Sequence, residues 1–321
     1  MRGATRLAIG LILHGILVPT TGFPQELFVV CQDDASLIRI DTRRETVTAR
    51  IGVAPGPAMI AATRDGRGIF ITHPESGIIT KLDARELGAP QILTTGGTPF
   101  GVAVDSVGRF IYVGDWKKNV VRMLDAKTGA TLMETPVGRE PAGLALDAAR
   151  ARLYVANRES HSVSVIETGS MRAFTEIGVG EGPFALALDA TGEHLFVANV
   201  RSGDISVIDT AKEAVLARVR VGGSPYGVAV DRTSNRILVT NQHGDNISAI
   251  DADTLEVIRT IEVGRYPEAV LGIDGKGYVA NWFSGDLSIL DLATGRRIAT
   301  LKLGDGPRSM VFTDASSGET R

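Results

Sequence analysis

Three residues with metal-ligating side chains stand at equal spacing along the chain. Cys31, His73 and Asp115 are each separated from the next by 42 residues. A thiolate, an imidazole and a carboxylate are ligands for zinc or copper, so these side chains would form a metal site if they converged. A similar spacing continues into residues that favour turn capping, which are Asn157, Asn199, Asn241 and Asn281. The sequence leaves both interpretations open, a metal site at the first three positions and a row of turn caps.

Aromatic and basic residues gather in the segments that follow these positions. Only 5% of the chain is aromatic, yet Trp116, Trp282 and Phe283 lie in polar, turn-forming stretches. Exposed aromatic side chains are typical of ligand stacking and of partner interfaces. We therefore predict a binding surface that consists of Trp116, Lys117, Arg158, His161, Arg201, His243, Tyr266, Trp282 and Phe283. Phe100 and Phe184, each directly after a proline, are expected to pack against neighbouring repeats instead.

A repeat marked by proline predicts the elements that position these residues. Five successive intervals of 42 residues and a last one of 40 separate Pro57, Pro99, Pro141, Pro183, Pro225, Pro267 and Pro307. One repeat, residues 184–225, contains the apolar runs "FALAL", "HLFVA", "ISVI" and "VLARVRV", separated by turn-forming stretches. Four strands in about 42 residues are the pattern of a β-propeller blade.

The two ends of the repeat region complement each other. Six full repeats fill residues 58–307, the segment Gln25–Pro57 lacks a first strand, and "RSMVFTD" at Arg308–Asp314 supplies one. We predict an all-β fold, a single seven-bladed propeller of four-stranded blades, closed by the C-terminal strand that completes the first blade. The loops after the second and fourth strands would then surround the mouth of a central channel, where ligands commonly bind.

The repeat text resembles a known family. "LYVAN", "LFVAN" and "LVTN" are followed by "VSVIET", "ISVIDT" and "ISAID", and then by "IGVG", "VRVG" and "IEVG". This pattern is similar to the YVTN family of propeller repeats, and the length and N-terminal segment resemble its exported, YncE-like members. The resemblance implies a propeller fold over nearly the whole mature chain. It leaves function open, because propellers serve as binding proteins and as enzymes.

The N-terminal residues predict export. Two arginines in Met1–Arg6 precede the short apolar run Leu7–Val18, which is typical of a signal peptide over residues 1–22. The propeller would occupy residues 23–321 of a periplasmic or secreted protein, with no membrane span after signal removal. A net charge of −3 and an excess of acidic over basic residues on the predicted face do not favour nucleic acid as a partner. A single cysteine rules out a covalent c-type haem.

Three functions remain. The regular repeat, without inserted loops, favours a non-enzymatic scaffold that presents the channel mouth to a protein partner or small ligand. The alternative is a propeller enzyme, either a lactonase-type hydrolase using groups such as His161 with Arg139 or Glu140, or a subunit of a quinone- or haem-linked oxidoreductase. A third hypothesis, from the resemblance, is an accessory protein of a periplasmic redox or alcohol-oxidising system. No cofactor is identified from the sequence, with a metal ion as the one candidate, and no catalytic residue is assigned.

Overall fold

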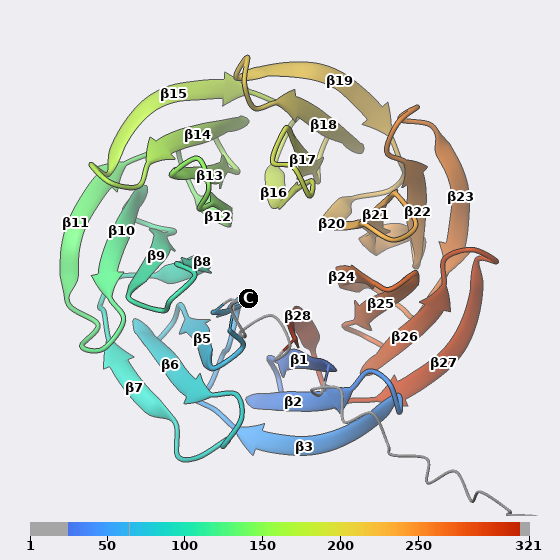
Figure 1. Ribbon diagram of the computed structural model, residues 1–321, viewed down its shortest axis with the longest axis horizontal. Helices are drawn as coiled ribbons and strands as arrows, with labels where there is room; N and C mark the ends of the chain where they lie inside the picture. The colour runs from blue at the N-terminus through green and yellow to red at the C-terminus, as the bar shows by residue number, and fades with distance from the viewer. Residues whose placement is uncertain (1–24, 64, 315–321) are drawn as a thin grey trace, which may run out of the picture.

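The structure is a computed structural model that describes residues 25–63 and 65–314. The predicted signal peptide lies outside these residues. Within them, 28 strands form seven separate four-stranded antiparallel sheets, and one short 3-10 helix follows β21, η1 (Gln242–Gly244). The sheets stand as blades around a central axis (Figure 1). The predicted seven-bladed propeller is confirmed.

Each blade runs from the axis outward. The innermost strands are β28 (Pro307–Asp314), β4 (Ile60–Ala62), β8 (Pro99–Val104), β12 (Pro141–Asp147), β16 (Pro183–Leu188), β20 (Pro225–Asp231) and β24 (Pro267–Ile273), in blades 1 to 7. The second strands are β1 (Gln25–Cys31), β5 (Gly68–His73), β9 (Phe110–Asp115), β13 (Arg152–Asn157), β17 (His194–Asn199), β21 (Arg236–Asn241) and β25 (Lys276–Asn281).

The outer half of each blade follows in chain order. The third strands are β2 (Ser36–Asp41), β6 (Ile78–Asp83), β10 (Val120–Asp125), β14 (Ser162–Glu167), β18 (Asp204–Asp209), β22 (Asn246–Asp251) and β26 (Asp286–Asp291). The outer strands are β3 (Thr46–Gly52), β7 (Gln91–Thr94), β11 (Thr131–Pro136), β15 (Arg172–Gly178), β19 (Ala214–Arg220), β23 (Val257–Glu262) and β27 (Arg296–Lys302).

The burial of the strands follows from their place in the blade. In β17, "HLFVAN", all residues after His194 are buried, because a second strand is covered on both faces by neighbouring blades. In β19, "AVLARVR", exposed and half-buried residues alternate, because an outer strand turns every second side chain to solvent. The core consequently consists of seven apolar clusters, each of which joins two adjacent blades.

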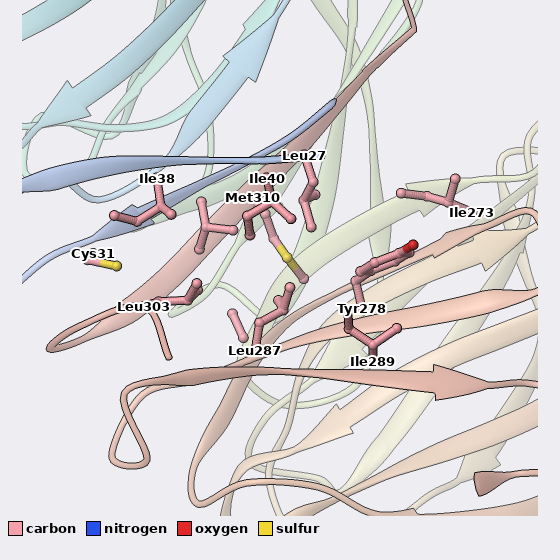
Figure 2. Close-up of a cluster of buried hydrophobic side chains, with 12 residues drawn as sticks. Leu27, Cys31, Ile38, Ile40, Ile273, Tyr278, Leu287, Ile289, Leu303 and Met310 are labelled. Atoms are coloured by element: carbon pink, nitrogen blue, oxygen red, sulfur yellow. The ribbon is translucent and has the colours of Figure 1, made fainter. Parts of the chain in front are cut away.

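The ring closes between the two ends of the described chain. Strand β28 pairs antiparallel with β1, with Phe28 opposite Val311 and Leu27 opposite Phe312. The seam between blades 1 and 7 is filled by an apolar cluster that includes Cys31, Tyr278 and Met310 (Figure 2). Because closure leaves no unpaired blade, the C-terminal strand stabilises the whole ring. Among the described residues no helix is long and apolar enough to cross a membrane.

Candidate binding face at the channel mouth

The residue after each marker proline belongs to a ring at the channel mouth. These residues are Ala58, Phe100, Ala142, Phe184, Tyr226, Glu268 and Arg308. In six blades the pairing register shifts directly after the proline, as between Pro99 and Val102 or Pro307 and Ser309. Such a bulge re-aims a side chain. Several of these side chains contact one another between blades that are not neighbours, so they reach across the channel.

Aromatic side chains fill one side of the mouth. The rings of Phe184 and Tyr226 stack with centroids 4.0 Å apart, and Phe100 meets Phe184 edge-on at 5.8 Å. Phe100 also contacts Trp116 at 4.7 Å. Phe100, Phe184 and Tyr226 come from the innermost strands of three blades, and Trp116 lies in the loop after β9 of the same blade as Phe100. Phe184 packs against Tyr226 of the neighbouring blade as expected, whereas Phe100 packs against Trp116 of its own blade and Phe184 across the channel. Trp116 is half-buried as the outer end of the same stack.

Arg308 occupies the other side of the mouth. Its guanidinium donates hydrogen bonds to Gln32 Oε1 and, at 3.3 Å, to Tyr226 Oη. It lies 5.5 Å from the ring centroid of Phe100 and 5.4 Å from that of Trp282, within cation–π range. Arg308 comes from the closing strand β28, so one side chain connects blades 1, 3, 6 and 7 across the mouth.

Glu268 is the ion-pair partner of Arg308. Its Oε2 lies 3.6 Å from Arg308 Nε, and its Oε1 accepts a hydrogen bond from Gln242 Nε2 at 3.1 Å. Only 6% of the Glu268 side chain is exposed. Burial raises its pKa to about 7, with Arg308 opposing that shift and Asp33 adding to it. The mouth therefore holds one carboxyl group that changes charge near neutral pH.

Two of the basic residues predicted to bind a ligand, Arg158 and Arg201, form ion pairs on the rim. Arg158 lies 3.4 Å from Glu140 and 3.5 Å from Glu159. Arg201 binds Glu159 with both terminal nitrogens, and this hydrogen-bonded pairing lowers the pKa of the Glu159 carboxyl. Trp116, Lys117, Asn119, Arg139, Glu140 and Glu159 line a shallow depression of about 540 Å³ beside them. The rim is thus aromatic and charge-paired.

The two predicted histidines lie on the same rim but do not line this depression. His161 Nδ1 accepts the backbone N–H of Gly182 at 3.1 Å, and His243 Nδ1 lies 3.0 Å from Ser224 Oγ. The His243 ring is 6.0 Å from Tyr266, which in turn is 4.7 Å from Phe283. Phe283 is 60% exposed. The structure therefore brings His243, Tyr266 and Phe283 together.

Cys31, His73 and Asp115 are the last residues of their second strands, and each is fully buried. His73 lies between Pro55 O at 3.1 Å and Thr80 Oγ1 at 2.8 Å, and burial lowers its pKa. Asp115 pairs with Arg122 at 3.4 Å. Cys31 belongs to the apolar seam between blades 1 and 7, and burial raises the pKa of its thiol to about 12.

The metal site expected from these three residues is not formed. Among residues 25–63 and 65–314, no group of three or more His, Cys, Asp or Glu side chains is placed to hold a metal ion. The physical reason is the direction of the side chains, because His73 and Asp115 turn back onto the third strand of their own blade and Cys31 packs in the seam between blades 1 and 7. The turn-cap interpretation is confirmed at Asp115, whose Oδ1 accepts the backbone N–H of Lys118 at 3.1 Å, but it is wrong for the asparagines. The four asparagines are buried and donate from Nδ2 to serines seven residues later, which are Ser164, Ser206, Ser248 and Ser288.

A family model described as YNCE-like β-propeller matches residues 76–278. The chain belongs to this family. A comparison with curated proteins gives no match. The solved structures that are similar to this YNCE-like propeller share little sequence with it, so they show the fold alone.

Three of these structures illustrate the range. A functionally unknown protein from Desulfotomaculum acetoxidans has a TM-score of 0.76 and 14% identity, covering 90% of this chain and 98% of that one. Dihydro-heme d1 dehydrogenase NirN, in complex with DHE, has a TM-score of 0.68 and 16% identity, covering 91% and 75%. Kuenenia stuttgartiensis hydrazine synthase has a TM-score of 0.53 and 19% identity, covering 74% and 96%. A similar ring of blades thus occurs in proteins of different activity.

Sequence reasoning missed the central role of Glu268 and Arg308, which in the sequence appear only as two of the charges on the face. A usable signal exists in the residue that follows each marker proline. That residue is acidic in one repeat, Glu268, and basic in the next, Arg308, whereas the other five repeats carry Ala, Phe or Tyr. In a closed ring the last two copies are neighbours, so the alignment predicts an ion pair at the mouth.

Proposed function

We propose that this YNCE-like propeller is an exported, non-enzymatic scaffold that binds a protein partner through its channel-mouth face. The observation that carries the proposal is the filled mouth: Phe100, Phe184, Tyr226 and the Arg308–Glu268 pair occupy its centre. A filled centre leaves a broad surface in place of a deep pocket, and broad surfaces suit protein partners.

The distribution of aromatic side chains supports a protein partner. Phe283 is 60% exposed, and Trp282 and Tyr266 beside it are half-buried. Aromatic residues surrounded by polar ones are enriched where binding energy concentrates in interfaces. The charges beside Trp116 on the same face, Arg158 and Arg201 with Glu140 and Glu159, are mutually paired. Because the rim charges are paired with one another, they would set the orientation and specificity of a bound partner, and they would not attract partners of one sign of charge.

Export is part of the proposal and rests on the N-terminal pattern of residues 1–22. An exported scaffold of this kind fits an accessory role in a periplasmic redox or catabolic system. The candidate groups for hydrolysis have other partners, since Glu140 pairs with Arg158, and Arg139 donates to the backbone oxygen of Glu159 at 2.7 Å. These contacts favour the binding role over the lactonase-type alternative.

Site-specific photocrosslinking in an exporting host tests the function. A photoreactive phenylalanine analogue replaces Phe283 in one variant and Leu216 in a control, which is 57% exposed on the outer strand β19. We expect one discrete adduct from position 283 and none from position 216. The partner identified from the adduct is then purified, and Phe283→Ala should weaken its binding at least about tenfold. Equal adducts from both positions, or unchanged affinity, would overturn the proposal.

A further inference from the structure

A cavity lies in the central channel beneath the mouth ring. It has a volume of about 190 Å³ and is lined by residues of the innermost strands. Most of its wall is apolar, with Leu144, Leu186, Val228, Leu271 and Met310 among the lining residues. Glu268, Arg308 and Tyr226, which belong to the mouth ring, line it as well. The cavity is therefore an apolar space with a polar end.

Two buried atoms at the polar end lack hydrogen-bond partners. They are Glu268 Oε2, an acceptor, and Arg308 Nε, a donor, and they lie 3.6 Å apart, beyond hydrogen-bond contact. The other polar atoms of the pair are used, because Glu268 Oε1 accepts from Gln242 and the Arg308 terminal nitrogens donate to Gln32 and Tyr226. Buried polar groups are almost always hydrogen-bonded. One buried acceptor and one buried donor are thus without a hydrogen-bond partner.

A hydroxyl group is the simplest chemistry that satisfies both atoms. Its O–H donates to Glu268 Oε2, and its oxygen accepts from Arg308 Nε. Above about pH 8, where Glu268 is ionised, a carboxylate would satisfy Arg308 but repel Glu268, and an ammonium would satisfy Glu268 but repel Arg308. Water has the same donor and acceptor, but further waters in the cavity would face apolar walls and lack partners.

We propose that the channel cavity binds a small aliphatic alcohol, with its hydroxyl between Glu268 and Arg308 and its carbon chain against the apolar wall. The volume agrees with this class. A water molecule occupies about 30 Å³ in the liquid, so about 190 Å³ accommodates roughly six groups of that size. A four-carbon alcohol has five non-hydrogen atoms. An engineered apolar cavity of about 150 Å³ is large enough to bind benzene.

The site adjoins the proposed partner surface, because Phe184, Tyr226, Glu268 and Arg308 of the mouth ring line the cavity. Phe283 and the Arg158–Glu159 pair do not line the cavity, whereas Arg308 faces it and also lies over the Trp282 ring. The two proposals are therefore tested with different variants, Phe283→Ala for the partner and Glu268→Gln for the alcohol, so that failure of one is distinguishable from failure of the other.

Ligand-observed NMR on the mature full chain tests the site with three matched probes, which are 1-butanol, butyrate and butylammonium. We expect saturable binding of 1-butanol alone, with Kd on the order of 1 mM, because a ligand of five heavy atoms makes few contacts. Glu268→Gln should weaken this binding at least about tenfold. The Gln242 contact keeps the amide oxygen in place, so an NH₂ group would face Arg308 Nε and the hydroxyl could no longer donate.

Two further variants locate the bound probe. Ala185→Leu places a larger side chain in the cavity wall and should abolish 1-butanol binding. Leu216→Ala, on the outer strand, should leave it unchanged. Circular dichroism and thermal melts verify that each variant is folded, and Glu268→Gln keeps the test decisive if Ala185→Leu does not fold. Butyrate binding as tightly as 1-butanol, no saturable probe, or no loss in Glu268→Gln would each overturn the proposal.

Discussion

The Nε2 atom of His73 lies 2.8 Å from the hydroxyl of Thr80 on the adjacent strand. The same two places hold Asn and Ser in four other blades, as in the 2.8 Å contact from Asn157 Nδ2 to Ser164 Oγ. In blade 3 they hold the ion pair of Asp115 and Arg122. The residue that ends the second strand and its partner on the third strand are therefore matched in each of these six blades. A change at one place alone leaves a buried polar group without its partner.

Blade 3 offers the sharpest test of this matching. Asp115 and Arg122 are 0% and 4% exposed, so Asp115→Asn would leave a buried guanidinium without its counter-charge. We expect the free energy of unfolding to fall by about 3 kcal/mol. The double variant Asp115→Asn/Arg122→Ser restores the Asn–Ser pair of the other blades and should recover at least half of that loss. Urea unfolding followed by tryptophan fluorescence measures both, and a double variant less stable than the single one would contradict the matching.

The buried side chain of Asn157 also explains why glycine occupies position 138. A Cβ on Gly138 would lie 2.6 Å from Asn157 Cγ. We expect Gly138→Ala to destabilise the protein by about 1–3 kcal/mol through overpacking. Gly169→Ala is the matched control, because a Cβ there meets nothing within 4 Å and its φ is not positive. Thermal unfolding of the two variants measures the difference in stability, and equal melting temperatures would show that Asn157 moves aside without any loss of stability.

The fold followed from the sequence because each repeat carries its own strands and turns. The intervals between Pro99 and Pro267 stay constant, so counting the repeats is enough to predict the number of blades and the closing role of Arg308–Asp314. The closing strand β28 begins at Pro307 and pairs with β1 as expected. Local patterns suffice for such a fold, since each blade packs mainly on its neighbours.

The site was harder to predict because it depends on where side chains turn within a blade. The position of His73 reads as the start of a loop, yet the residue ends strand β5 with its ring buried against Thr80. Contacts across the channel, such as Arg308 with Phe100, join residues far apart in the chain. Strand periodicity contains no information about them, and only the alignment of equivalent positions around the ring would have suggested the pair of Arg308 with Glu268.

The buried carboxyl at the mouth predicts a pH dependence of stability. The pKa of Glu268 rises from an ordinary 4.5 to about 7 in the folded protein, through burial and Asp33, against the effect of Arg308. Tyr226 and Tyr266 also face it, and burial raises their pKa values, so they stay neutral in this range. The native state then holds a proton that the unfolded chain has lost, so this contribution is complete below pH 4.5 and is lost as the pH rises through about 7.

The loss is on the order of 3 kcal/mol, and it should appear as a decline in melting temperature between pH 4.5 and 7. Glu268→Gln removes the titrating group, so the difference in stability between wild type and variant should change across that window and be constant above about pH 8. A difference that does not vary with pH would show that Glu268 titrates near its ordinary value.

The single cysteine reports on ring closure. Cys31 is fully buried in the seam between blades 1 and 7, and burial raises its thiol pKa to about 12. Because only the thiolate reacts, alkylation by iodoacetamide at about pH 8 should be at least about a thousandfold slower in the native protein than in urea. Mass spectrometry over time measures the rate, and native labelling at the unfolded rate would contradict this burial.

The same reaction distinguishes local opening of the seam from global unfolding. Met310 packs in the cluster with Cys31, whereas Ile205 packs between blades 5 and 6. If the seam opens by itself, Met310→Ala should accelerate labelling of Cys31 more than Ile205→Ala does, even where both variants lose similar stability. Equal acceleration would mean that Cys31 becomes accessible only when the ring unfolds as a whole. A faster rate in Met310→Ala would instead identify the pairing of β28 with β1 as the weakest joint of the propeller, because that pairing joins the two ends of the chain.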